Sequence, residues 1–389
     1  MTARFLATVS VAVVVVMVFA LAPAKVSGQT SQDADTLRTP WNEPDLQGIW
    51  ANQTATPLQR PTEYGNREFL TDEERAALDR QRLERALANP GRDQRKEPGS
   101  EKDVAGAYNA VWNTQPGDPG SSQTGARTSL VFDPPDGRIP PITPAALERF
   151  TAIRDYLAAL LIGSSGGDPG PPSPKRLLPP PYYNLERINR SDGPEDRAAS
   201  ERCLGSSLPD FRGFFRIVQS PGYVAVYYEA NSGGGNRIIP IDGSAHLPAH
   251  MRQGMGDARA RWEDDTLVVD TTNFTQKTSY RGSRDNLHLI ERYTRVDADT
   301  IDYQLTVEDP TIWTAPWSLE VPLTRQDGRQ NLIFDSPCHE GNFGMTGMLA
   351  NQRAAEQSFA EGRGPDPATM DVATGGGSGE PRLGPLGAR

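Results

Sequence analysis

The chain has 389 residues, of which 36% are apolar and 23% charged, and it contains 37 glycines and 34 prolines. This apolar fraction suffices for a sizeable core, so the chain is not wholly disordered, and the glycines and prolines predict many turns. The net charge of −10 and the lack of a long Lys/Arg run disfavour a nucleic-acid partner and docking to anionic membranes.

Residues 1–28 have the layout of a secretory signal peptide. Arg4 provides a basic start, residues 5–22 are almost entirely apolar, and small residues follow up to Gly28. The pattern predicts cleavage near Gly28 and a periplasmic or secreted protein, and the alternative is an uncleaved membrane anchor. No later apolar run approaches the roughly 20 residues of a membrane span, so none is expected after cleavage.

The predicted export affects the expected redox state of the two cysteines, Cys203 and Cys338. In an oxidising compartment they would form one disulfide bond between distant segments. The alternative is two buried free thiols. A zinc site built on cysteines is not expected, because the chain has no C-x-x-C pair.

The first half of the chain mixes short strands, helices and loops. Thr71-Asp72-Glu73-Glu74 is a capping-box pattern, and Thr143-Pro144 is a typical helix start. Pro/Gly-rich residues 163–182 predict a loop or linker. The elements expected here are strands at 46–52 and 128–132, a surface helix at 71–88, and a helix at 144–161 that packs on the fold through an apolar stripe.

From about residue 212, strand patterns recur at short spacing and are separated by turn signals. They predict an antiparallel meander, and closing it as a barrel removes exposed strand edges. We therefore expect a mainly β fold, an antiparallel barrel or strongly curved sheet, as a single domain over 29–360 with peripheral helices and a disordered tail at 361–389. The strands lie at 214–219, 223–229, 237–241, 258–262, 266–271, 287–295, 300–308, 318–324 and 331–335, and a helix follows near 345–360.

Gly48-Ile49-Trp50, in the first predicted strand, resembles the G-x-W signature of lipocalins and calycins. The resemblance implies an up-and-down barrel in which the tryptophan plugs one end and an arginine from a late strand covers it. Arg292 or Arg295 would be that arginine. The long segment between this strand and residue 212 departs from the compact lipocalin pattern.

A second resemblance covers nearly the whole mature chain and joins it to a group of exported bacterial proteins. It implies export and a shared fold, and it supplies no activity. The segments that resemble this group are Pro44 to Trp50, Asp133 to Pro141, Trp262 to Phe274 and Cys338 to Asn342.

All four histidines lie between residues 246 and 339. His246, His250 and His339 are candidate ligands for a divalent metal such as zinc, copper or iron, because imidazoles suit these ions. Glu340 is a candidate ligand or catalytic base beside His339. The alternative is that each histidine caps a loop or satisfies a polar group of the core. Asp257 follows the histidine pair closely and is a candidate to orient one of the two rings.

Strand 287–295 places His288 and Arg292 on one face by alternation, with Glu291 and Tyr293 on the other. If the His288/Arg292 face points into a barrel, the two side chains suit an anionic or carbonyl-bearing ligand. Alternatively, the strand is salt-bridged and exposed on one side.

Two classes of function remain open. The first is an extracytoplasmic hydrolase, lyase or isomerase with a histidine-centred site, either metal-dependent or metal-free, in which His288 and Glu340 act as catalytic groups and Arg292 clamps an anion. The second is a non-catalytic, lipocalin-like protein that binds an apolar or aromatic small molecule or a carbohydrate. Convergence of the histidines in space would favour the first class.

Overall fold

The computed structural model describes residues 37–87, 124–151, 193–194, 202–204, 208–211, 213–229, 235–276, 278–326 and 343–364. Every element named below belongs to one compact unit, Thr39–Arg389. The predicted signal peptide, the loop 163–182, the strand 331–335 and the tail from 365 onward lie outside the described residues.

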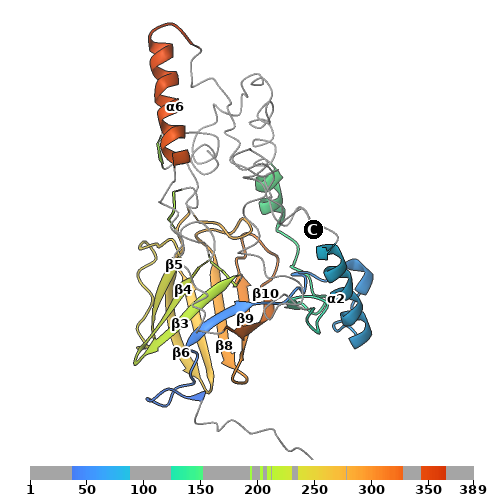
Figure 1. The fold of residues 1–389 in the computed structure, drawn as a ribbon. Helices are drawn as coiled ribbons and strands as arrows, with labels where there is room; N and C mark the ends of the chain where they lie inside the picture. Colours follow the sequence, from blue (N-terminus) through green and yellow to red (C-terminus); the bar gives the residue numbers. More distant parts are fainter. Residues whose placement is uncertain are drawn as a thin grey trace, which may run out of the picture. The chain divides into compact units, whose positions relative to one another are not determined.

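The described strands form one antiparallel sheet, which confirms the predicted mainly β barrel class (Figure 1). Along the sheet the order is β5-β4-β3-β1-β10-β9-β8-β7-β6, and β2 pairs with β10 off this path. The strands are β1 Gly48–Asn52, β2 Val131–Asp133, β3 Phe214–Ser220, β4 Tyr223–Tyr228, β5 Gly235–Pro240, β6 Asp257–Glu263, β7 Thr266–Thr272, β8 His288–Arg295, β9 Thr300–Glu308 and β10 Trp317–Arg325.

The sheet curls into a nearly closed barrel with one seam. β1 pairs with both β3 and β10, so the first strand joins the early and late strands of the meander. The two ends of the sheet, β5 and β6, lie next to each other. No ladder joins β5 to β6 in the described part of the chain. The seam therefore lies between these two edge strands.

Alternation of side chains builds the core inside the barrel. On β9, Ile301, Tyr303, Leu305 and Val307 are buried while their neighbours are partly exposed, as a strand with one inward face requires. On β8 the inward residues are Leu289, Glu291 and Tyr293. The face of β8 that carries His288 and Arg292 therefore points outward. Of the two arrangements considered for this strand, the salt-bridged outer face is the observed one.

Tight turns connect the strands where the sequence places turn residues. Gly222 has a φ of +82° between β3 and β4, and Asp264 has a φ of +52° between β6 and β7. Both angles lie in the left-handed region that two-residue hairpin loops use.

Of the described helices, α2, 144–151 and α6 lie at predicted positions, and the short η2 was not predicted. Helix α2 (Asp72–Leu87) begins with the expected capping box, in which the Glu74 N–H donates to Thr71 Oγ1 and the Thr71 N–H donates to Glu74 Oε2. The other described helices are 144–151, the short η2 (Thr62–Tyr64) and α6 (Phe343–Ala360). In helix 144–151, Phe150 is buried and Leu147 is exposed, so of these two apolar side chains only Phe150 packs into the fold.

Trp50 is completely buried, and its indole N–H donates to the Leu46 carbonyl over 2.9 Å. Of the two arginines expected to cover this ring, Arg295 does so, with its guanidinium carbon 5.8 Å from the ring centre. Arg325 lies 5.7 Å from the same ring centre. Gly48 has a φ of +142°, and a Cβ there would come within 3.4 Å of the indole nitrogen, so glycine suits this position.

Candidate functional site

A chain of alternating carboxylates and imidazoles runs along the outer face of the barrel near the seam. His246, in the loop between β5 and β6, contacts Asp257 of β6 through Nδ1 (2.9 Å) and Asp270 of β7 through Nε2 (3.1 Å). His288 of β8 contacts the same Asp270 oxygen through Nε2 (3.1 Å) and Glu308 of β9 through Nδ1 (2.9 Å). We call these five residues the histidine–carboxylate chain.

Strand register explains how these side chains meet. His288 and Glu308 are directly paired between β8 and β9, and Asp270 lies diagonally across from His288 because its own partner is Ile290. Diagonal neighbours on one face of a sheet are within reach of long side chains. The predicted contact between Asp257 and a histidine is confirmed, and that histidine is His246.

The two hydrogen bonds of His288 bear on its protonation. A neutral imidazole has one N–H, so His288 can donate to both Asp270 and Glu308 only when both of its nitrogens are protonated. Hydrogen bonding to Asp270 accordingly raises the pKa of His288, against the opposing effect of burial. The hydrogen bond from His288 lowers the pKa of Asp270 below its usual range.

Asp257 also anchors the start of β6. Its carboxylate accepts from Arg259 Nη1 over 2.7 Å and from the Leu247 N–H over 2.9 Å. The side chain is 4% exposed, so these donors and His246 replace water around a buried charge. Arg259 Nε in turn donates to the Ala245 carbonyl, which fastens the loop before His246.

A second polar network lies inside the barrel. Arg237 of β5 donates to Glu291 of β8 over 2.8 Å and to Thr271 of β7 over 2.8 Å. The hydroxyls of Tyr293 and Tyr303 donate to the other oxygen of Glu291. Burial is the largest single influence and lowers the pKa of Arg237, but the Glu291 carboxylate together with Tyr228 and Tyr293 raises this pKa overall. Arg237 is therefore a permanent cation inside the barrel.

Tyr228 of β4 completes this inner network, with its hydroxyl 3.2 Å from Arg237 Nη1. Burial raises the pKa of Tyr228 to about 12, so the hydroxyl stays neutral. Arg237 Nε is the one donor of this guanidinium that is buried without a hydrogen-bond partner in the described residues.

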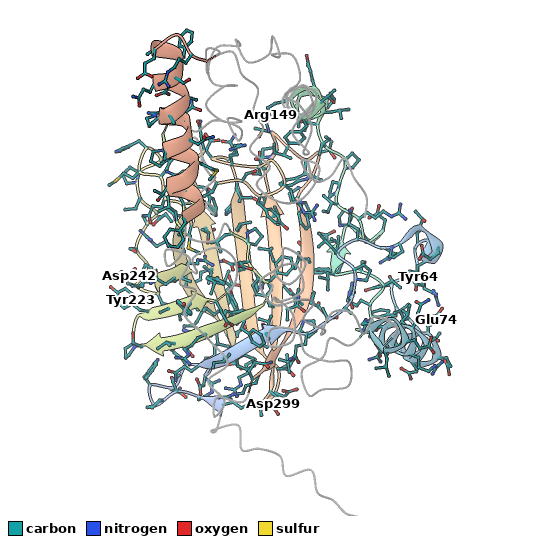
Figure 2. The ribbon with its side chains drawn as sticks, turned by 45° about the horizontal axis from the view of Figure 1, so that its top comes forward. Tyr64, Glu74, Arg149, Tyr223, Asp242 and Asp299 are labelled. Atoms are coloured by element: carbon teal, nitrogen blue, oxygen red, sulfur yellow. The ribbon has the colours of Figure 1, made fainter. Side chains whose placement is uncertain are left out.

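A pocket of about 380 Å³ opens at the seam and touches both networks. Arg237 belongs to the inner network, whereas Asp257 and Arg259 belong to the outer groups, and all three line this seam pocket. Tyr223 of β4, labelled in Figure 2, is also one of the lining residues. The other lining residues come from β5, β6 and the loop between them: Asn236, Ile238, Pro240, Leu247, Gln253, Met255, Gly256 and Ala258.

The structure brings together only part of the site predicted from the sequence. His246 and His288 share Asp270, but His250 is exposed and makes no hydrogen bond to the described residues. Arg292 is on the outer surface, paired with Glu263 over 2.8 Å, so it does not face the barrel interior. His339 and Glu340 lie outside the described residues, and their roles stay predictions.

Two contributors were not found by sequence reasoning. Glu308 was predicted to end a strand, and its partnership with His288 follows only from the β8–β9 register. Nothing in the sequence singled out Arg237 as a functional residue, because it was predicted only to begin a short strand. Its partner Glu291 is 54 residues away in the sequence.

In the described part of the chain, no group of three or more histidine, cysteine, aspartate or glutamate side chains stands ready to hold a metal ion. The chain matches no protein-family model and no curated protein. The resemblances to lipocalins and to exported bacterial proteins therefore stay predictions.

Proposed function

We propose that this chain is an exported barrel protein that binds a small molecule in the seam pocket between β5 and β6. The observation that supports this most directly is the Arg237 side chain, which is 3% exposed, lines the pocket and has an Nε donor without a partner in the described residues. An unsatisfied buried donor is costly, and a ligand oxygen would satisfy it.

The lining residues suggest the chemistry of the ligand. Arg237 and Arg259 supply positive charge, while Ile238, Leu247 and Met255 supply apolar surface. Asp257 already accepts from Arg259, so it leaves little negative charge toward a ligand. This combination suits a small molecule with an apolar body and one carboxylate or carbonyl oxygen.

The test compares two exposed side chains on β5 and β3, the two strands that flank β4 in the sheet. Ile238 is 72% exposed and lines the pocket, so Ile238→Asp places a negative charge at its mouth with little cost to the fold. Val218→Asp is the matched control, because Val218 is 49% exposed on β3 and does not line the pocket. Binding of benzoate, benzamide, a short fatty acid and a monosaccharide would be measured by calorimetry.

We expect the acids to bind the native protein and the Val218→Asp variant alike, with at least a tenfold loss in the Ile238→Asp variant. The neutral benzamide would lose less, because charge repulsion acts on the acid alone. If none of these probes bound, or if both variants bound them equally, the proposal that the seam pocket binds a small molecule would lose its support.

A second candidate is the histidine-centred hydrolase, lyase or isomerase. The observation that favours it is the contact between His246 and Asp257, because Asp257 lines the pocket and a carboxylate-held imidazole is a common general base. The test is recovery of the bound probe. A ligand returned unchanged by the native protein and by His246→Gln favours the binding function, and turnover that His246→Gln abolishes favours the enzyme.

We infer export to the periplasm or beyond from residues 1–28. Among the described helices, none is long and apolar enough to span a membrane. Sequencing the N-terminus of the protein recovered outside the cytoplasm tests the inference. A first residue near Gln29 supports cleavage, and an intact Met1 refutes it.

A further inference from the structure

Another cavity, of about 230 Å³, lies against helix α2 and shares no lining residue with the seam pocket. Its walls come from the segment after β1, from η2, from α2 and from residues 124–128. The apolar part of its lining is Ala55, Pro57, Pro61, Tyr64, Leu70 and Leu78. We propose that this cavity, which we call the helix pocket, binds a free α-amino acid with an apolar side chain.

Hydrogen bonds fix the walls of the helix pocket to one another. Asp79 of α2 accepts from the Thr124 N–H over 3.0 Å and from the Thr124 hydroxyl over 2.8 Å. Arg82, one turn later on α2, donates to the same hydroxyl over 2.7 Å. The chain just before α2 is joined to the same segment, because the Leu70 N–H donates to the Ala126 carbonyl over 2.8 Å. The cavity is therefore formed before a ligand arrives, as small-molecule sites usually are.

Arg127 supplies a group that can hold the ligand carboxylate. Its side chain is 20% exposed and lines the pocket, and its Nε is buried without a hydrogen-bond partner in the described residues. Nη2 pairs with Glu68 over 2.8 Å. The guanidinium also lies over the rings of Phe69 and Phe132, so its position is set from several sides. An unsatisfied buried donor is costly, and a carboxylate oxygen of the ligand would satisfy it.

Glu63 supplies the opposite charge. It lines the pocket, is exposed, and has no hydrogen bond or ion pair with another described residue. Arg82 also lines the pocket, but Asp79 and Thr124 already engage its guanidinium. The lining thus offers one cationic donor at Arg127 and one unpaired anion at Glu63. A zwitterion, with a carboxylate and an ammonium group, meets both of them.

The volume of the helix pocket limits the size of this zwitterion. An apolar cavity of roughly 150 Å³ holds one benzene molecule. A cavity of about 230 Å³ therefore has room for a branched or aromatic side chain together with the main-chain atoms of one amino acid. The prolines, the leucines and the tyrosine ring in the lining favour burial of an apolar side chain over a charged one.

The experiment measures binding of L-leucine and L-phenylalanine to the untagged protein by calorimetry. Two derivatives separate the charges, because N-acetyl-leucine lacks the ammonium group and leucinamide lacks the carboxylate. The variants are Glu63→Gln, at an exposed position, and Arg127→Lys, which keeps a positive charge but removes Nε. Glu84→Gln is the matched control, since Glu84 is an exposed glutamate of α2 that does not line the pocket. Thermal unfolding shows whether each variant has folded.

We expect one amino acid per chain at this site and about tenfold weaker binding of each derivative than of leucine. Glu63→Gln should weaken leucine binding about tenfold and leave N-acetyl-leucine binding unchanged, because that derivative has no ammonium group to lose. Arg127→Lys should weaken leucine binding by a similar factor and affect leucinamide less. Glu84→Gln should bind leucine as the native protein does.

The seam-pocket variant Ile238→Asp should also keep its leucine affinity, which separates this site from the seam pocket. The proposal is overturned if the folded native protein binds neither amino acid. It is also overturned if Glu84→Gln or Ile238→Asp loses as much leucine affinity as Glu63→Gln, or if both derivatives bind as tightly as leucine.

Discussion

Arg237 and Glu291 form an ion pair inside the barrel, with 2.8 Å between Nη1 and Oε2 and with side chains that are 3% and 2% exposed. The pair joins β5, an edge strand at the seam, to β8 in the opposite half of the sheet order. Removing two charges from water is costly, and the hydroxyls of three tyrosines and one threonine offset part of that cost. The pair therefore helps to hold β5 in place, since no other described strand pairs with β5 on its seam side.

The first prediction concerns this pair. Glu291→Leu leaves the Arg237 cation buried without its partner and should lower the free energy of unfolding by about 3–5 kcal/mol. The double variant Arg237→Met/Glu291→Leu removes both charges and should recover most of that loss. Urea unfolding of the native protein, both single variants and the double variant measures the coupling. A double variant as unstable as the sum of the single variants would show that the two residues act independently.

The second prediction concerns Asp302 on the outer face of β9. Burial, followed by repulsion from Glu320, raises the pKa of Asp302 to about 6. The native state then holds a proton that the unfolded chain releases from about pH 4 upward, so this group lowers stability as pH rises from about 4 to about 6. Above about pH 6 the penalty is constant.

Asp302→Asn removes that penalty. We expect the variant to be more stable than the native protein by about 1–2 kcal/mol at neutral pH, a value reduced for partial exposure, and no more stable near pH 4. Asp299→Asn, at an exposed aspartate in the β8–β9 turn (Figure 2), is the control and should follow the native curve. Urea midpoints measured across this pH range test the sign. If Asp302→Asn raised stability equally near pH 4 and at neutral pH, the predicted pH dependence would be wrong.

The strands were predictable because their determinants are local. Alternation on β9 and the turn residues between β6 and β7 act within a few positions, and the predicted bounds of β6, β7 and β9 differ from the observed ones by at most one residue at either end. The direction of β8 was harder, because both of its faces carry charged groups. Only the curvature of the whole sheet decides that Glu291 is inside and Arg292 outside.

The candidate site was predictable only in part for a similar reason. Asp257 is eleven positions from His246, and closeness in sequence was enough to suggest their contact. Arg237 reaches Glu291 across the barrel, and Asp270 lies between two histidines from different segments. Such contacts depend on the order of strands around the barrel and on the position of the seam, which local patterns do not encode.

The third prediction concerns the cysteines. Cys203 is buried, and Cys338 lies outside the described residues, so their disulfide bond remains a sequence prediction. Thiol titration of the exported, denatured protein should detect no free thiol before reduction and two after it. Cys338→Ser should lower the free energy of unfolding by about 4 kcal/mol if the chain-entropy model holds. Two titratable thiols in the unreduced protein would refute the bond.

The last prediction concerns Gly282, where the chain passes over the helix at 144–151. Gly282 has a φ of +90°, and a Cβ at this position would lie 2.1 Å from Phe150 Cζ. Phe150 is 5% exposed and belongs to the main hydrophobic core, so its ring has little room to move. Gly282→Ala thus combines backbone strain with a steric clash.

Gly222 separates these two effects. Its φ of +82° is similar, but a Cβ there would have no atom of the described residues within 4 Å. Gly222→Ala should therefore cost about 1–2 kcal/mol from backbone strain alone, whereas Gly282→Ala should cost a further 1–3 kcal/mol, roughly, from overpacking. Adding Phe150→Leu to Gly282→Ala should return part of the clash energy, because the smaller side chain makes room for the methyl group. Urea unfolding of the native protein and these three variants measures these differences, and equal losses in Gly222→Ala and Gly282→Ala would show that Phe150 yields without cost.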